Sequence, residues 1–169
     1  MTRSHHLPTV LVLLLALTLS ACGFQLRGQA NLPPEMARTQ IQGLSEYSDL
    51  GRDLRRLLEG SGVQVVPSAE QATAILDIIT NQAGRRVLSV QAGGKVQEYE
   101  LIQRLVFSVR TTDGRLLLEP QELELAREYL YDRFDPLASG SQEGEIRAEM
   151  RRDITQLLML RLQALGSDG

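Results

Sequence analysis

Two glutamates are the first side chains in this sequence that could act as an acid and a base. Glu98 and Glu100 lie two residues apart in a stretch that alternates apolar and polar residues, as a β-strand does. Side chains two apart point to the same face, about 7 Å from each other. That separation suits the paired carboxylates of a glycosidase. A polar strand face also produces such pairs without any catalytic role, so both interpretations stay open.

A second group of residues could bind an anion. Arg85 and Arg86 precede, and Lys95 follows, a turn indicated by Gly93-Gly94. If two strands pair about this turn, we expect the three cations to lie close together at one end of a sheet, where they could bind phosphates. Exposed cations that keep the end of a hairpin soluble are an equally good explanation.

The only cysteine, Cys22, lies directly behind an apolar leader. The apolar run over residues 10–19 would span roughly 15 Å as a helix, half of the hydrocarbon core of a membrane, which is typical of a secretory signal. The letters LSAC over 19–22 resemble the bacterial lipobox, in which the cysteine is lipidated. An internal disulfide is excluded because there is no second cysteine. We therefore expect residues 1–21 to be a lipoprotein signal peptide and Cys22 to carry a lipid anchor.

The lipid anchor also indicates a location. Each buried CH₂ contributes about 0.8 kcal/mol and a single acyl chain binds weakly, so a cysteine with several chains would stay on the membrane. Gly23 stands where an aspartate would retain a lipoprotein at the inner membrane. In the lipoproteins that this leader resembles, that indicates the outer membrane, with the domain facing the periplasm. The alternative is a plain signal peptide followed by a free thiol.

The composition of the exported chain excludes several enzyme classes. Both histidines, His5 and His6, lie in the leader, and the one cysteine is used for lipid. Ser–His–Asp and Cys–His catalysis and a zinc site of His or Cys ligands are therefore excluded, and we expect no metal and no cofactor. Removal of the leader takes away one of the 18 basic residues and none of the 21 acidic ones, which leaves the exported chain with a net charge of −4. That balance gives no reason to expect nucleic acid as a partner.

The remaining pattern predicts one domain behind a tether. Residues 22–35 are polar and end in Pro33-Pro34, which favours an extended, lipidated tether. Residues 36–166 are long enough to form a single core. A helix is predicted within 46–62, after a first short strand. Strands are predicted near 38–43, at 63–66, over 72–90, between the turns at 92–95 and 113–114, and over 115–131 with an interruption at Pro120.

The last 35 residues predict a loop and then a helix. Residues 135–145 are small and polar and are predicted to be a loop, whereas 146–165 carry an apolar stripe at helical spacing. The order of elements implies an α+β fold, a two-layer sandwich with two helices on one face of a mostly antiparallel sheet of about four strands. The apolar stripe, which should face the sheet, consists of Ile146, Met150, Ile154, Leu157, Leu158, Leu162 and Leu165.

Three motifs together resemble the lipopolysaccharide (LPS)-assembly lipoprotein family. They are CGFQLRG at 22–28, EYEL at 98–101 behind a glycine-containing turn, and PLASGSQEGEIRAEM at 136–150. Each motif alone is weak, but their order and spacing cover nearly the whole mature chain. Members of this family form the small subunit of the outer-membrane LPS translocon.

The resemblance implies a function and a partner. It implies a lipoprotein that plugs a large outer-membrane β-barrel translocon subunit, helps the barrel assemble and binds LPS for its insertion into the outer leaflet. Family members can carry cations in the hairpin tip and in the loop before the last helix, but here these stretches read QAGG and ASGSQEG. Arg85, Arg86 and Lys95 are the residues that could bind LPS in their place.

Other functions also fit the sequence. The chain could be a generic periplasm-facing interaction module of another envelope-assembly complex, for example one that recruits a partner strand to its sheet edge. A cell-wall glycosidase using Glu98 and Glu100 is the other possibility. Co-purification with a large barrel and turnover of peptidoglycan would separate these functions.

Overall fold

The computed structural model describes residues 32–91 and 95–167, so the predicted signal peptide, Cys22 and most of the tether lie outside the described residues. Among the described residues, no helix is both long and apolar enough to cross a membrane. The elements, in chain order, are η1 (Pro34–Ala37), β1 (Arg38–Gln42), α2 (Asp49–Gly60), β2 (Gln64–Val65), η2 (Ala69–Gln71), β3 (Ala74–Gln91), β4 (Lys95–Thr111), β5 (Leu116–Leu130) and α3 (Pro136–Ser167).

The five strands form one sheet in the order β2-β1-β3-β4-β5. β1 pairs in parallel with both β2 and β3, whereas the long β3, β4 and β5 pair antiparallel. This confirms the predicted α+β class, with five strands rather than about four because the two-residue β2 adds an edge. β5 is the other edge, and its register with β4 shifts near Pro120, as the missing N–H of proline requires.

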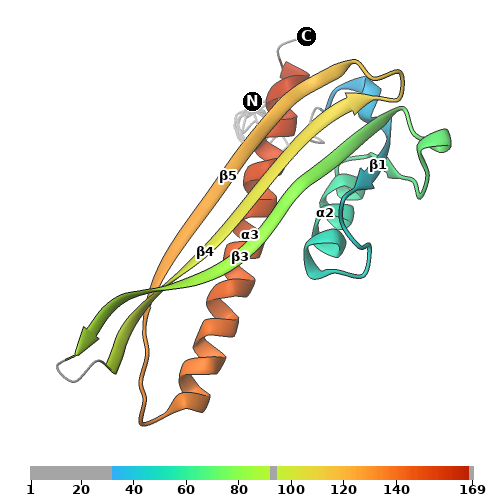
Figure 1. Ribbon diagram of the computed structural model, residues 1–169. Coiled ribbons are helices and arrows are strands. Elements are labelled where there is room, and N and C mark those ends of the chain that lie inside the picture. The colour runs from blue at the N-terminus through green and yellow to red at the C-terminus, as the bar shows by residue number, and fades with distance from the viewer. Residues whose placement is uncertain (1–31, 92–94, 168–169) are drawn as a thin grey trace, which may run out of the picture.

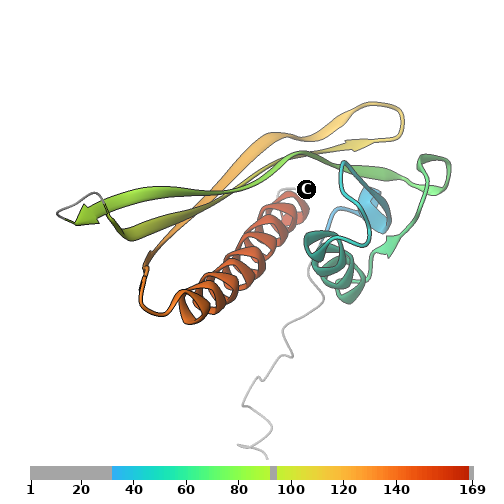
Figure 2. The same cartoon turned by 60° about the horizontal axis from the view of Figure 1, so that its bottom comes forward.

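Both α-helices lie on the same face of the sheet, and α3 runs along most of its length (Figure 1, Figure 2). The sheet has five strands at one end, where β1 pairs with residues 74–77 of β3, and only three beyond it. We call the five-stranded end the proximal half. The distal half comprises β3 from Gln82 onward, the parts of β4 and β5 paired with it, the connection from β5 into α3, and α3 up to Met150.

A glycine marks the point at which β1 leaves the sheet. Gly43 has a φ of +83°, and a Cβ there would lie 2.1 Å from the carbonyl oxygen of Ile78. The register of β3 with β4 shifts between Ile78 and Thr80, directly beside this contact. Only glycine has both the backbone conformation and the space that this close approach requires. β1 therefore ends here, and the distal half continues with three strands.

The main core lies in the proximal half between the sheet and both helices. The alternation predicted for β4 is confirmed, because Leu105, Phe107 and Val109 are fully buried on the helix side. The predicted stripe of the last helix is confirmed at Ile154, Leu158 and Leu162, which are fully buried, but Leu157 is 37% exposed and lies outside it. α2, on the same face of the sheet, contributes Leu50, Leu54 and Leu58. Burying such a side chain contributes about 1.5–3 kcal/mol, so this cluster makes the larger apolar contribution of the two cores.

The prediction of a loop over residues 135–145 is wrong, because α3 begins at Pro136. The Asp135 carboxylate accepts a hydrogen bond from the backbone N–H of Ala138 (3.0 Å), which caps the first turn. The hydroxyl of Ser139 accepts one from the N–H of Asp132 (2.9 Å) and ties the helix to the end of β5. These contacts outweigh the poor helix propensity of the glycines and serines in this stretch.

Candidate functional site

The structure does not bring the three predicted cations together. Arg85 pairs with Leu101 and Arg86 with Glu100, so these adjacent arginines point to opposite faces of the sheet. Lys95 pairs with Gln91, five residues from Glu100 along β4, or roughly 17 Å away. The side chain of Lys95 lies outside the described part of the structure. The expectation of a single close cluster is therefore wrong, because strand alternation separates the two arginines.

Arg86 lies on the face away from the helices and neutralises a buried carboxylate. Its guanidinium forms an ion pair with Glu100, which is only 8% exposed. Glu98 and Glu100 share this face, as their spacing predicts, and Glu128 of β5 lies directly opposite Glu100. Like charges in opposite positions destabilise a sheet, so Arg86 offsets a local excess of negative charge. Glu100 thus acts as a counterion in the sheet.

Arg85 lies on the helix side and belongs to a polar group that we call the Glu143 cluster, comprising Arg85, Tyr99, Tyr129, Glu143 and Arg147. Arg85 Nη1 is 3.0 Å from Glu143 Oε2, and the Tyr129 hydroxyl donates to the same oxygen at 2.6 Å. Arg147 Nε donates to Glu143 Oε1 at 2.9 Å. The Arg85 guanidinium also lies 4.3 Å from the centre of the Tyr99 ring. Two strands and α3 therefore meet at one carboxylate.

The electrostatics of the cluster fix its protonation at neutral pH. Burial alone would raise the pKa of Glu143, but hydrogen bonds from Tyr129 and Arg147 outweigh it, so the pKa lies below its usual value. Burial and the hydrogen bond to Glu143 raise the pKa of Tyr129 above its usual value. Glu143 is therefore a carboxylate and Tyr129 a neutral donor. The donors of the cluster thus hold a charged carboxylate.

Aromatic rings pack together within and beside the Glu143 cluster. The Tyr99 and Tyr129 rings stack with centres 5.7 Å apart, and Tyr131 contacts Tyr99 edge-on at 5.6 Å. Such pairs contribute about 0.5–1.5 kcal/mol beyond their burial. Leu101 and Met150 complete this small second core. The donors Arg85 and Tyr129 are therefore held on packed strands.

Several large apolar side chains are exposed in the distal half. Phe134 and Leu137 are 83% and 87% exposed in the connection from β5 into α3. Arg133 lies against the Phe134 ring, 4.5 Å from its centre, and forms no ion pair within the described residues. Sequence reasoning missed Arg133 and Phe134, whose only signal is an aromatic residue between charged ones in a connection. We call the exposed set the distal apolar tip, consisting of Val87, Leu88, Val90, Leu130, Phe134 and Leu137.

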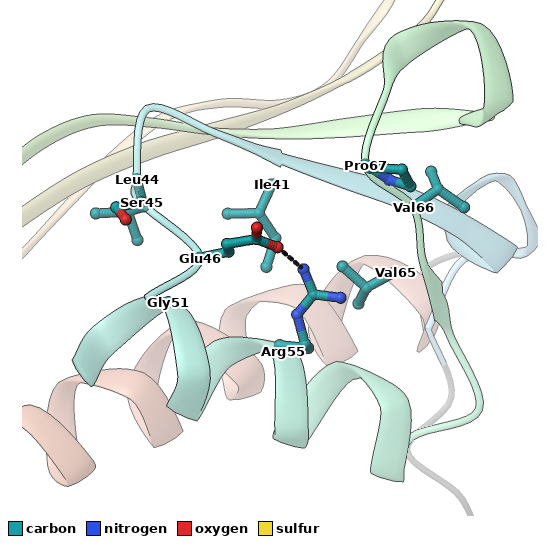
Figure 3. Close-up of a pocket in the computed structure, with 9 residues that line it drawn as sticks. All are labelled: Ile41, Leu44, Ser45, Glu46, Gly51, Arg55, Val65, Val66 and Pro67. Carbon is teal, nitrogen blue, oxygen red and sulfur yellow. Dashed lines mark hydrogen bonds and ion pairs between the residues drawn. The ribbon is translucent and has the colours of Figure 1, made fainter. Parts of the chain in front are cut away.

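A cavity in the proximal half is the other candidate site (Figure 3). It has a volume of about 210 Å³ and lies between β1, the start of α2 and the segment after β2. Its apolar residues include Ile41, Leu44 and Val65, and Glu46 and Arg55 pair across it at 3.1 Å. Because ligand pockets usually measure about 300–1,000 Å³, this one suits a single apolar side chain better than a large amphiphile.

Solved structures of bacterial lipoproteins share this fold. Lipoprotein B from Nitrosomonas europaea is 28% identical, with a TM-score of 0.72 over 86% of this chain and 93% of that one. The rare lipoprotein B from Shewanella oneidensis is 29% identical, with a TM-score of 0.63 over 75% and 93%. The fold thus defines a small lipoprotein domain of the α+β class.

The sequence then identifies the family. The sequence model of the LptE family, described as lipopolysaccharide-assembly, matches residues 36–162. This protein belongs to that family. The LPS-assembly lipoprotein LptE of Photorhabdus laumondii is 27% identical over 158 residues, 94% of this chain and 86% of its own. That of Pectobacterium atrosepticum is 26% identical over 159 residues, 94% and 85% of the two chains.

Proposed function

We propose that this protein is a non-catalytic outer-membrane lipoprotein that plugs a β-barrel LPS translocon, helps it assemble and binds LPS for insertion into the outer leaflet. Membership of the LPS-assembly family supports this role, as do the names of its relatives. The buried, ion-paired state of Glu100 favours a structural role for the Glu98/Glu100 pair over glycoside hydrolysis. Lipidation of Cys22 would anchor the domain, facing the periplasm and reaching into the barrel lumen.

The proposed organisation places the anchor and the ligand end apart. Residues 1–21 would be removed, 22–35 would form the lipidated tether and 36–166 the LPS-assembly domain. The described chain begins at Leu32, which packs against the proximal core, whereas the distal half lies at the other end of the sheet (Figure 1). A lipid-anchored domain of this shape can extend its distal half away from the membrane that holds its tether. Acyl mass on Cys22 of membrane-extracted protein would test the anchor.

The distal apolar tip and Arg133 are the observation that carries the proposal of LPS binding. LPS combines acyl chains with phosphates, so its site requires exposed apolar surface beside a cation. Phe134 and Leu137 supply the apolar surface, and Arg133 is a cation without a carboxylate partner in the described structure. Charge-assisted hydrogen bonds contribute about 1.5–3 kcal/mol each when well made.

The three cations predicted from the sequence remain part of the proposal, as contacts secondary to Arg133. Arg86 is occupied by Glu100 and Arg85 by Glu143, so either must exchange a carboxylate for a phosphate to bind LPS. Lys95 lies in β4 near the hairpin turn. We propose Arg133 as the first contact with LPS phosphate and Arg85, Arg86 and Lys95 as additional contacts.

LPS binding to the purified mature domain tests this site. We expect Arg133→Ser combined with Phe134→Ser to weaken LPS binding about tenfold or more, the loss of one charge-assisted contact and one apolar contact. Arg152→Ser with Leu160→Ser is the matched control, because it removes the same charge and another exposed apolar side chain from α3. Equal loss in both double variants would show that only charge and hydrophobicity matter, and would contradict the site.

Isolation of the native complex tests the partner. From detergent-solubilised outer membranes we expect the protein to co-purify with a large β-barrel subunit. Recovery in an envelope complex without such a barrel would favour the generic interaction module instead. Activity of the pure protein on peptidoglycan, lost in Glu98→Gln, would contradict the non-catalytic role.

A further inference from the structure

Donors from three elements converge on the carboxylate of Glu143. Arg85 comes from β3, Tyr129 from β5 and Arg147 from α3, and all three lie within 3.0 Å of its oxygens. Two guanidinium groups and a phenol around one anion are the donors that phosphate-binding sites use. We infer that the Glu143 cluster is a phosphate-binding site in which Glu143 serves as an internal ligand that a phosphate group can displace.

The donors are accessible to a competing anion. The side chains of Arg85 and Arg147 are 44% and 32% exposed, so one side of the cluster opens to solvent. Phosphate carries up to two negative charges and more acceptor oxygens than a carboxylate, so it can satisfy all three donors at once. The stacking of Tyr129 on Tyr99 and the cation–π contact of Arg85 keep the two strand donors in place after the exchange.

The position of Glu143 in the chain allows its side chain to move away from the three donors. It lies between Gly140 and Gly144, where an added Cβ would meet no neighbouring atom within 4 Å. Within residues 136–145, Ser139 is the one buried side chain, and Leu137 projects into solvent. Each glycine lowers helix stability relative to alanine. The first turns of α3 are thus held by polar contacts, and local unwinding there exposes little apolar surface.

At neutral pH, protonation of Glu143 does not free the donors for a ligand. Because the pKa of Glu143 lies below its usual value, the carboxylate stays charged at neutral pH and competes directly with any phosphate. A ligand of higher negative charge is therefore required. If the proposed function holds, the phosphates of LPS are that ligand; free phosphate has the same chemistry and is distinguished by the probes below.

Substitution of Glu143 tests the inference by a gain of binding. In the mature domain we expect Glu143→Gln to bind inorganic phosphate about tenfold more tightly than the wild type, because a charged competitor is lost. Glu143→Asp should give a smaller gain, since it keeps the competing charge but its shorter side chain cannot reach all three donors. Glu149→Gln makes the same charge change on an exposed position of α3 and should have no effect. Titration followed by NMR measures each affinity, and circular dichroism verifies folding.

A further variant locates the gained site. Arg85→Ser in the Glu143→Gln background should abolish the gain, whereas a gain that survives it would place the anion elsewhere and overturn the inference. No gain in either folded Glu143 variant, or an equal gain in Glu149→Gln, would also overturn it. Repeating the titration with LPS and with dephosphorylated LPS identifies the source. Tighter binding of inorganic phosphate but not of LPS would support the site and contradict its use for LPS.

Discussion

Leu158 and Leu101 are both fully buried on the same side of the sheet, but their neighbours differ in kind. Leu158 belongs to the proximal core, a continuous set of sixteen buried side chains from the sheet and both helices. Leu101 belongs to a distal set of three, surrounded by tyrosines and covered by the Glu143 cluster. Dispersion and the hydrophobic effect therefore hold the proximal half, whereas directional polar contacts hold the distal half.

This difference separates stability from binding within one small domain. Polar groups that are partly exposed can exchange their partners for a ligand, whereas an apolar core can only lose stability when it is opened. The proximal half can thus keep the fold intact while the distal half rearranges. Four measurements test this division, beginning with the one that should have the largest effect.

The largest effect is expected from a charge in the proximal core. Ile154→Asp should destabilise the domain by about 4 kcal/mol or more, because Ile154 is 0% exposed and the carboxylate would have no partner. Chemical unfolding of the purified domain measures the change. Glu149→Ala, on the exposed side of the same helix, should lie within about 0.5 kcal/mol of the wild type. Similar losses for the two variants would mean that the stripe does not pack against the sheet.

A cavity in the distal core should have a smaller and more local effect. Leu101→Ala should cost about 2–3 kcal/mol, at the low end for buried leucines, because few apolar neighbours surround this residue. Hydrogen exchange should then increase over the distal hairpin and the start of α3, while α2 keeps the protection of the wild type. Uniform loss of protection over both halves would contradict independent stabilisation.

The smallest effect should come from acid. A carboxylate with a lowered pKa stabilises the fold above its unfolded pKa, and that stability is lost as the pH falls through the folded pKa. The wild type should therefore lose stability below about pH 4.3, the usual value for glutamate, and Glu143→Gln should lose less over the same range. Melting temperatures measured between pH 6 and pH 3 would show this; parallel curves would contradict the role of Glu143.

The sequence predicts the proximal half well and the distal half poorly, for the same reason. Apolar periodicity identifies Phe107 and Ile154 as buried because burial there depends on side-chain type alone. The start of α3 was predicted as a loop because Gly140 and Gly144 favour one locally. Its helix depends on contacts with Asp132 and Tyr129, which no local pattern reveals.

The strand period of two already implied that Arg85 and Arg86 point to opposite faces of the sheet. The pairing of Arg85 with Glu143 joins residues 58 positions apart and could not be predicted without the fold. Arg133 could only be recognised once the structure showed which arginines lack a carboxylate partner.

Hydrogen exchange of the lipidated wild-type protein, with and without LPS, tests the central claim that the distal half is the ligand end. We predict changed exchange in the described distal segments, chiefly 84–90 and 128–147, and unchanged exchange in α2, β1 and the cavity beside Arg55. Faster exchange at the start of α3 alongside slower exchange in β3 would further support displacement of Glu143. Changes confined to α2 and the proximal cavity, with the distal segments unaffected, would contradict the account.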